Sequence, residues 1–550
     1  MSHPPPAKDS AEIRAALLER REIALLDVRE EDPHAQAHPL FAANLPLSRL
    51  ELDACTRLPR RDVPIVTLDN GEGYARRAAL RLLEMGYTDV AVLKNGISGW
   101  RAAGGQLFRD VNVPSKAFGE LVAHTRHTPA LAAEEVRALL EDAGADAIVL
   151  DVRRFDEYHT MSIPTAISVP GAELALRTPE LAPRPETRVI VNCAGRTRSI
   201  IGAQSLINAG LPNPVFALRN GTIGWTLAAL ALDHGQNRRS GPVCEATRKT
   251  AAARAARLAE RAGVKRTSLA AIAPWQNQNG RTTYFFDVRE PQEYTAAHLP
   301  GFRDVPGGQL VQETEMNAPV RGARIVLFDD DGVRANMTAS WLAQMDWDVH
   351  VLTLLEGSDE WRAALREHGP WQAPLPALPA LAAKNLVTPA TLALWLNLPP
   401  APSATTTASA SSAVVVDLTT SANYRDGHIP GAHFALRAQL AQIFPRLPKA
   451  ARYVLTCKSS LLARFAHAEL AARAAKSQVF VLEGGTDAWR AAGLPLERDE
   501  YHFASPPQDR YRRPYEGTDN SKEAMQAYLD WEFGLVAQLE KDGTHHFRVL

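Results

Sequence analysis

Cysteine is scarce in this sequence. Four cysteines occur among 550 residues, at Cys55, Cys193, Cys244 and Cys457. They are too scattered for a disulfide framework, and none belongs to a Cys-x-x-Cys pair that would bind a metal or undergo redox cycling. We therefore expect single thiols in a reducing compartment and no metal site.

Long apolar runs and an excess of one charge are also missing. No apolar run approaches the roughly 18 residues that cross a bilayer, and residues 1–10 lack the charged and apolar regions of a secretory signal. The 61 basic and 62 acidic side chains leave a net charge of −1, so no overall field attracts nucleic acid or anionic lipid. These absences predict a cytoplasmic protein with no membrane and no nucleic-acid partner.

What the sequence does contain is an internal repeat. Four apolar runs end in aspartate, at Asp27, Asp151, Asp287 and Asp417. A second apolar run follows each of them and ends at Asp69, Cys193, Asp329 and Cys457. Each copy closes with Gly-x-x-x-Trp, whose tryptophans are Trp100, Trp225, Trp361 and Trp489. Short apolar runs, typical of buried strands, alternate with segments whose apolar residues have helical spacing. This alternation predicts an α/β fold, with a parallel β-sheet flanked by α-helices in each of four tandem copies.

The motifs around these landmarks resemble the rhodanese family. Residues 287–294 with 298–301, echoed by residues 424–432, are similar to the opening signature of rhodanese domains, and residues 484–489 are similar to the closing one. The resemblance implies a compact α/β domain whose catalytic cysteine lies in a loop between a strand and the next helix. It also implies sulfur transfer from thiosulfate or a related donor to a thiophilic acceptor.

The landmarks divide the chain into domains and connecting segments. Rhodanese-like domains are predicted at residues 8–110, 127–238, 267–371 and 386–500. The pairs Thr128-Pro129 and Thr388-Pro389 are typical of helix starts. Residues 401–413, rich in Pro, Ser, Thr and Ala, are predicted to form a disordered surface loop.

Two further segments have helical patterns. The basic segment 239–266 is Ala-rich, and a solvated linker helix is favoured over a nucleic-acid contact because no aromatic residues alternate with the charges for base stacking. Residues 501–550 form a tail with an amphipathic helix. Its apolar stripe consists of Tyr528, Trp531, Leu535 and Leu539, and we expect it to dock on a domain.

Cys193 is the favoured catalytic thiol. It opens the loop Cys193-Ala194-Gly195-Arg196-Thr197-Arg198-Ser199, between a predicted strand and a predicted helix. Backbone N–H groups at a helix start and two arginines favour an anion there, so we expect a lowered thiol pKa and donor binding by residues 194–199. The alternative is a buried, inert cysteine. Cysteine phosphatases use a longer Cys-x-x-x-x-x-Arg loop, whereas four residues separate Cys193 from Arg198 here, which suits a single sulfur.

The other three loops differ from this one. Asp69 and Asp329 replace the cysteine in copies one and three. A carboxylate cannot carry sulfane sulfur, so we expect these copies to be inactive, with the aspartates stabilising helix starts. Copy four offers a candidate second site, Cys457-Lys458-Ser459-Ser460. Its Leu462 stands where Arg198 stands in copy two, which weakens anion binding and leaves the role of Cys457 open.

The sequence therefore predicts a sulfurtransferase of the thiosulfate type. Cys193 would take sulfane sulfur from a small anionic donor, hold it as a covalent persulfide without any cofactor, and pass it to cyanide or to a thiol, including a protein thiol. The alternative is a multidomain binding or scaffold protein with little or no catalysis. One role for the inactive copies is to wall the Cys193 site and restrict its acceptors.

Overall fold

The computed structural model describes residues 4–354, 359–364, 367–398, 413–474 and 476–550. The predicted loop at 401–413 therefore lies outside the described residues except for Ala413, and so does Gly357 of the third closing motif. The described chain forms four sheets built on parallel strands and covered by helices, as predicted. No helix among these residues is both long and apolar enough to cross a bilayer.

Repeats one and two have the same order of elements. Repeat one consists of β1 (Ala7–Lys8), α1 (Ser10–Leu18), β2 (Ile23–Asp27), α2 (Glu31–Gln36), β3 (Ala43–Asn44), α3 (Leu50–Arg57), β4 (Ile65–Leu68), α4 (Tyr74–Glu84), β5 (Val90–Leu93) and α5 (Gly96–Ala102). Repeat two consists of β6 (Ala130–Leu131), α7 (Ala133–Glu141), β7 (Ala147–Asp151), α8 (Phe155–Thr160), β8 (Ile167–Ser168), α9 (Leu174–Leu181), β9 (Arg188–Asn192), α10 (Thr197–Asn208), β10 (Val215–Leu218) and α11 (Gly221–Leu227). The strand order in repeat two is β6-β10-β9-β7-β8.

Repeats three and four follow the same plan. Repeat three consists of β11 (Lys265–Arg266), α13 (Leu269–Ile272), β12 (Thr283–Asp287), α14 (Pro291–Ala296), β13 (Arg303–Asp304), α15 (Gly307–Gln312), α16 (Thr314–Asn317), β14 (Val320–Arg321), β15 (Arg324–Asp329), α17 (Arg334–Gln344), β16 (Asp348–Thr353) and α18 (Asp359–Ala364). Repeat four consists of β17 (Leu386–Val387), α19 (Pro389–Trp395), β18 (Ala413–Asp417), α20 (Ser421–Asp426), β19 (His433–Phe434), α21 (Leu440–Ile443), β20 (Arg452–Thr456), α22 (Leu461–Ala471), β21 (Gln478–Leu482) and α23 (Gly485–Ala491). The sheet of repeat three includes β11, which the predicted boundary had left in the linker.

The two predicted helix starts have different outcomes. Thr388 is the N-cap of α19, and its hydroxyl accepts the N–H of Thr391 at 3.2 Å, as expected. The prediction for Thr128 is wrong, because the chain stays extended to form β6, which pairs with β10, and α7 begins only after Ala132. In repeat four the corresponding strand β17 precedes the threonine instead.

The closing Gly-x-x-x-Trp motif holds the loop in place. The glycines Gly96, Gly221 and Gly485 have positive φ values, and a Cβ on them would lie 2.2, 2.3 and 2.1 Å from the carbonyl oxygens of Asp69, Cys193 and Cys457, respectively. Only glycine allows so close an approach in this backbone conformation. The tryptophans Trp100, Trp225 and Trp489 are buried in the cores. The motif is therefore structural and is independent of whether the loop carries a thiol.

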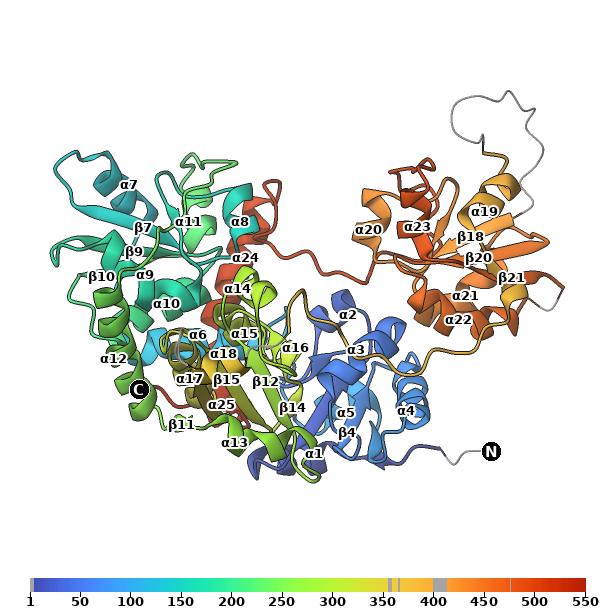
Figure 1. Cartoon of the computed structure of the whole chain (residues 1–550), viewed down its shortest axis with the longest axis horizontal. Coiled ribbons are helices and arrows are strands. Elements are labelled where there is room, and N and C mark those ends of the chain that lie inside the picture. Colours follow the sequence, from blue (N-terminus) through green and yellow to red (C-terminus); the bar gives the residue numbers. More distant parts are fainter. Residues whose placement is uncertain (1–3, 355–358, 365–366, 399–412, 475) are drawn as a thin grey trace.

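The repeats pack into one another unevenly. Strand β14 of repeat three pairs antiparallel with β2 of repeat one, and one hydrophobic core runs through both repeats. Repeat four joins repeat one through an ion pair in which Arg437 donates to Glu51 at 2.8 Å. Figure 1 shows repeat four (orange) at one end of the molecule and repeat two (teal) at the other, with repeats one and three between them.

Two helical segments connect repeats, and a helical tail follows repeat four; all three are docked on the rest of the chain. Helix α6 (Val113–Arg126) follows repeat one, and α12 (Glu245–Arg261) is the predicted basic linker helix. It is not fully solvated, because Ala251, Ala255 and Leu258 bury one face of it near α9 and α17. The tail returns from repeat four to repeat two, and its helices α24 (Lys522–Phe533) and α25 (Leu535–Asp542) pack on α6. Contacts of α24 with α11 of repeat two confirm the predicted docking, whereas the single predicted helix is divided into two at Gly534.

Candidate active site

Cys193 lies between β9 and α10, at the carboxyl edge of the repeat-two sheet. Its side chain is buried, with 2% of the residue exposed. A cavity of about 20 Å³ is lined by Cys193 and residues 194–198. Ser199 does not line it but lies against the thiol, and its hydroxyl is 2.8 Å from the Arg196 carbonyl oxygen. On this measure the cavity has room for about one atom the size of a water molecule beside the thiol.

Part of the wall of this cavity comes from outside repeat two. Besides the loop, it is lined by Ser115 and Lys116 of α6, Gln312 of α15, and Tyr515 and Tyr528 of the tail. These residues lie far from Cys193 in the sequence, and sequence reasoning missed them as site residues. The single available signal was the aromatic stripe that contains Tyr528, which predicted docking without showing where.

The expectation of a lowered thiol pKa is wrong for this closed conformation. Burial raises the pKa of Cys193 above its ordinary value, although the charge of Arg198 and a hydrogen bond from Ser199 act in the opposite direction. The nearby Glu532 of α24 adds to the increase, since a second negative charge disfavours the thiolate. The tail thus brings both desolvation and negative charge to the loop, and neither was visible in the loop sequence.

Both loop arginines are already paired with carboxylates. Arg196 donates to the two oxygens of Glu120 at 2.7 and 2.8 Å. Arg198 donates to the two oxygens of Glu157 at 2.8 and 2.9 Å. Burial alone would raise the pKa of Glu157, but Arg198 lowers it to about 2. The guanidinium groups are therefore held in fixed positions, and their charge beside Cys193 is partly offset.

Lys116 anchors the tail beside the loop. Its buried ammonium group donates to Asp110 at 2.7 Å. It also lies 5.5 Å from the ring centre of Tyr515, 5.1 Å from that of Tyr528 and 5.5 Å from that of Trp531. A buried cation surrounded by aromatic faces is favourable because the rings replace part of its hydration. This cluster stabilises α24 against α6 and over Cys193.

Helix α24 covers the loop directly. A Cβ on Gly195 would lie 3.1 Å from the ring of Tyr528, so a larger side chain at this position would press against the helix. The Tyr528 hydroxyl donates to Glu532 at 2.8 Å, while the second carboxylate oxygen of Glu532 is buried without a hydrogen-bond partner. Burial raises the pKa of Glu532 to about 7.

In repeats one and three the aspartate occupies the anion position of the loop. Asp69 accepts the N–H of Gly71 at 3.1 Å and that of Ala75, in α4, at 2.9 Å. Asp329 accepts the N–H of Ala335, in α17, at 3.0 Å. The carboxylates thus satisfy N–H groups of the loop and of the first helical turn, although they are not themselves the N-cap residues.

Arg334, the arginine that repeat three retains in its loop, is also paired with carboxylates. Arg334 pairs with Glu173 at 3.1 Å, Asp330 at 2.9 Å and Asp331 at 2.6 Å, and its fourth partner is Glu293. A loop filled by its own carboxylates and surrounded by others repels an anionic donor. This geometry supports the expectation that repeat three carries no sulfur.

Repeat four keeps a buried thiol in an apolar setting. Cys457 is 5% exposed and packs in a hydrophobic cluster with Leu462. Burial raises its pKa, and backbone N–H groups of Ala463, Leu462 and Ser459 oppose that increase. Of the other candidate residues, Lys458 and Ser459 are exposed and Ser460 is buried. The second site stays a prediction.

The four equivalent α/β units, each with a loop of N–H groups at the carboxyl edge of a parallel sheet, define a tandem array of one domain type. Residues 10–103, 132–228, 273–364 and 404–492 match the family model of the rhodanese-like domain. The chain belongs to this family, and the predicted fold of four rhodanese-like domains is confirmed.

Comparison with individual proteins includes a match that covers nearly all of the chain. A crystal structure of thiosulfate sulfurtransferase from Pseudomonas aeruginosa is 64% identical, with a TM-score of 0.93, over 99% of this chain and 100% of that one. The Alr3790 protein from Anabaena sp. is 23% identical over 19% of this chain and 93% of its own, with a TM-score of 0.18. The uncharacterized protein YibN of Escherichia coli is 26% identical over 85 residues, which are 15% of this chain and 59% of that protein.

Proposed function

We propose that this protein is a thiosulfate-type sulfurtransferase that carries sulfur on Cys193. One observation carries the assignment of the site. Among the four equivalent loops, all within the described residues, the loop of repeat two combines a thiol, two fixed arginines and an adjoining cavity. The similarity to the Pseudomonas aeruginosa thiosulfate sulfurtransferase supports the reaction.

The reaction has two half-reactions. The Cys193 thiolate attacks the outer sulfur of thiosulfate, the S–S bond breaks, and sulfite leaves with the electron pair. The persulfide lies at the start of α10, where backbone N–H groups and the helix dipole favour negative charge. Cyanide or a thiolate then attacks the outer sulfur of the persulfide, and the Cys193 thiolate is released. The proposal includes no cofactor.

The closed site requires a movement before the donor can enter. A cavity of about 20 Å³ beside a thiol that is 2% exposed does not hold thiosulfate. Of the groups that line it from outside the loop, Tyr515 and Tyr528 belong to the tail, so displacement of the tail from the loop is the simplest opening. Exposure to solvent would also lower the thiol pKa, because burial is the largest cause of its increase. Opening the site thus admits the donor and favours the nucleophile.

The proposal extends to the setting and the acceptor. All four cysteines are free, which suits a reducing, cytoplasmic compartment. The acceptor is cyanide or a thiol, including a protein thiol.

Sulfur transfer from thiosulfate to cyanide tests the function. We expect activity in the wild type, its loss in Cys193→Ser and its retention in the matched control Cys457→Ser, with ping-pong kinetics. Activity that survives Cys193→Ser would overturn the site. A wild type that is inactive with every donor tried would favour a binding or scaffold protein.

A further inference from the structure

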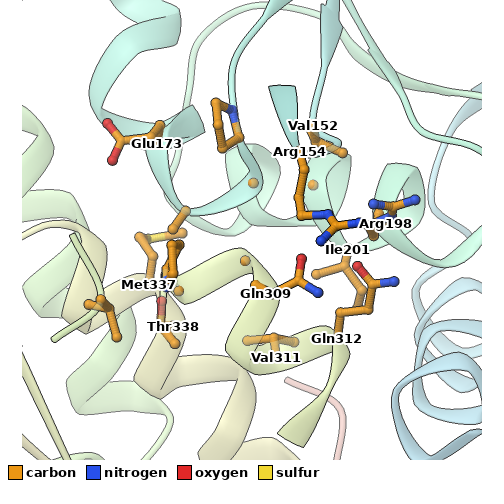
Figure 2. A pocket seen from close by; sticks show the side chains of 18 of the residues that line it. Val152, Arg154, Glu173, Arg198, Ile201, Gln309, Val311, Gln312, Met337 and Thr338 are labelled. Atoms are coloured by element: carbon orange, nitrogen blue, oxygen red, sulfur yellow. The ribbon is translucent and has the colours of Figure 1, made fainter. Parts of the chain in front are cut away.

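A chamber of about 540 Å³ lies between repeats two and three. Figure 2 shows its walls: loops and helices of repeat two on one side, and α15 and α17 of repeat three on the other. Phe118 and Ser115 of α6 also line it. Chambers of about 300–1,000 Å³ are the usual size for binding small organic molecules. Thiosulfate, with five non-hydrogen atoms, would leave most of this volume empty.

The chamber adjoins the Cys193 cavity. Both are lined by Ser115, Thr197, Arg198 and Gln312. The Ser115 hydroxyl donates to the Gln312 carbonyl at 2.7 Å and so fixes α6 against α15 at this shared wall. A molecule in the chamber is therefore separated from the sulfur only by side chains that line both spaces.

The lining has an apolar part and a cationic part. The apolar side chains include Phe118, Val152, Ile201, Val311, Met337 and Trp341. Two exposed arginines, Arg154 and Arg239, also line the chamber, and Arg239 lies 3.4 Å from the ring centre of Phe155. Figure 2 shows Arg154 reaching into the chamber toward Gln309. This combination suits a ligand with an apolar body and an anionic group.

The acidic residues of the chamber repel an anionic ligand only weakly. Glu173 is paired with Arg177 at 2.7 Å and with Arg334 at 3.1 Å. Burial raises the pKa of Glu290 to about 7, which leaves it partly protonated at neutral pH. Asp156 is exposed to solvent, where its charge is screened.

An unsatisfied polar atom also points to a ligand. The side-chain oxygen of Gln312 is buried without a hydrogen-bond partner among the described residues. Leaving such an atom unpaired is unfavourable, because it loses its hydrogen bonds to water without gaining others. A donor group on a bound molecule, such as a thiol or amide hydrogen, would satisfy it at the wall shared with the Cys193 cavity.

We propose that this chamber binds the sulfur acceptor, an organic thiol with an apolar body and a carboxylate. The inference rests on the proposed function and adds the acceptor site to it. The acceptor thiolate attacks the outer sulfur of the Cys193 persulfide, and the S–S bond to Cys193 breaks. The electron pair goes to the Cys193 sulfur as a thiolate, and the acceptor leaves as its own persulfide. Repeat three, which carries no thiol in its loop, supplies one wall of this site.

The test compares three acceptors on the full-length protein with thiosulfate as donor. Mercaptohexanoate has the proposed apolar body and carboxylate, mercaptohexanol has the same body without the charge, and cyanide has neither. Gln309→Trp fills the chamber from α15, since Gln309 is half-buried and points into it, and Gln309→Ala is the matched control. The double variant Arg154→Gln/Arg239→Gln removes the two exposed positive charges, while Arg177 and Arg198, which also line the chamber, stay paired with Glu173 and Glu157.

We expect Gln309→Trp to lower kcat/KM for mercaptohexanoate at least tenfold, with less than a twofold change for cyanide and for Gln309→Ala. The double arginine variant should lower kcat/KM several-fold for mercaptohexanoate and leave mercaptohexanol unchanged. Retained cyanide turnover shows that the fold and Cys193 are intact. Equal effects on all acceptors, or none on mercaptohexanoate, would overturn the chamber assignment while leaving the sulfurtransferase in place. If the wild type itself transferred no sulfur from thiosulfate to cyanide, the proposed function would instead be refuted.

Discussion

The loops of repeats two and three have the same backbone setting and opposite chemistry. In repeat three, Asp329 binds the N–H of Ala335, and Arg334 is surrounded by four carboxylates. In repeat two, the equivalent position is a thiol beside a small cavity, and Arg198 has one carboxylate partner, Glu157, with two oxygens. One loop is filled by its own side chains, and the other leaves room for a single sulfur.

The comparison shows that copies of one domain type share a fold and differ in what fills their loops. The loop of repeat three is filled by its own side chains, and its helices α15 and α17 form a wall beside repeat two. The sequence of a single repeat cannot reveal this role, because the wall belongs to the interface.

Arg198→Leu gives repeat two the residue found in repeat four and should have the largest effect. Arg198 is the main group that lowers the pKa of Cys193 against burial. Removing one preorganised charge from a site of this kind costs about 100-fold in rate, which steady-state kinetics with thiosulfate would measure.

This substitution needs a control for stability. It removes the bidentate partner of the half-buried Glu157 and leaves Arg154, at 3.5 Å, as the remaining ion-pair contact. Breaking a fully buried ion pair can cost about 3–5 kcal/mol, and the partly exposed Glu157 should lose less. Arg198→Leu/Glu157→Gln removes both charges and should restore stability but not activity. Recovery of activity in the double variant would show that Arg198 acts only by neutralising Glu157.

Gly221→Ala should act at both the fold and the site. Its Cβ would lie 2.3 Å from the Cys193 carbonyl oxygen, and its φ is +53°. We expect a loss of about 1–3 kcal/mol in unfolding free energy from backbone strain and at least a tenfold fall in activity, because the loop must move.

Gly96→Ala is the matched variant in repeat one. Its Cβ would lie 2.2 Å from the Asp69 carbonyl oxygen, so a similar loss of stability is expected by thermal unfolding. Its activity should change little, since that loop carries no thiol. An equal fall in activity for both glycine variants would contradict the division between the repeats.

The sequence was sufficient to predict the repeated fold and the position of Cys193 in a loop between a strand and a helix, because local patterns encode both. The buried strand β9, the turn at Gly195 and the start of α10 are adjacent in the chain. Lys116, Gln312 and Tyr515 could not be found in this way, since they reach the site from helices and a tail that pack on it from elsewhere. The predicted direction of the shift in the Cys193 pKa was wrong for the same reason, because the tail that buries the thiol is more than 300 residues away in the chain.

Glu532→Gln should produce a smaller, pH-dependent change. Ionised Glu532 disfavours the Cys193 thiolate, so its removal should lower the thiol pKa and move the rising limb of the pH–rate profile to lower pH. If the pH–rate profiles of the wild type and the variant superimpose, the charge of Glu532 does not affect the pKa of Cys193.

The same substitution makes a prediction for stability. The pKa of Glu532 is raised from 4.5 to about 7 in the folded protein, so the folded state favours its protonated form. The contribution of protonated Glu532 to the free energy of unfolding is fully present below pH 4.5 and is lost as the pH rises through about 7. Chemical unfolding from pH 5 to 8 should therefore show the wild type losing stability relative to Glu532→Gln. A difference that does not vary with pH would contradict the assigned titration.

The intact mass of the protein after treatment with thiosulfate tests the central claim most directly. The account predicts one added sulfur atom in the wild type and in Cys457→Ser, none in Cys193→Ser, and none restored when Asp329→Cys is added to Cys193→Ser. Sulfur that remains on the protein after Cys193→Ser would contradict the claim that repeat two carries the sulfur.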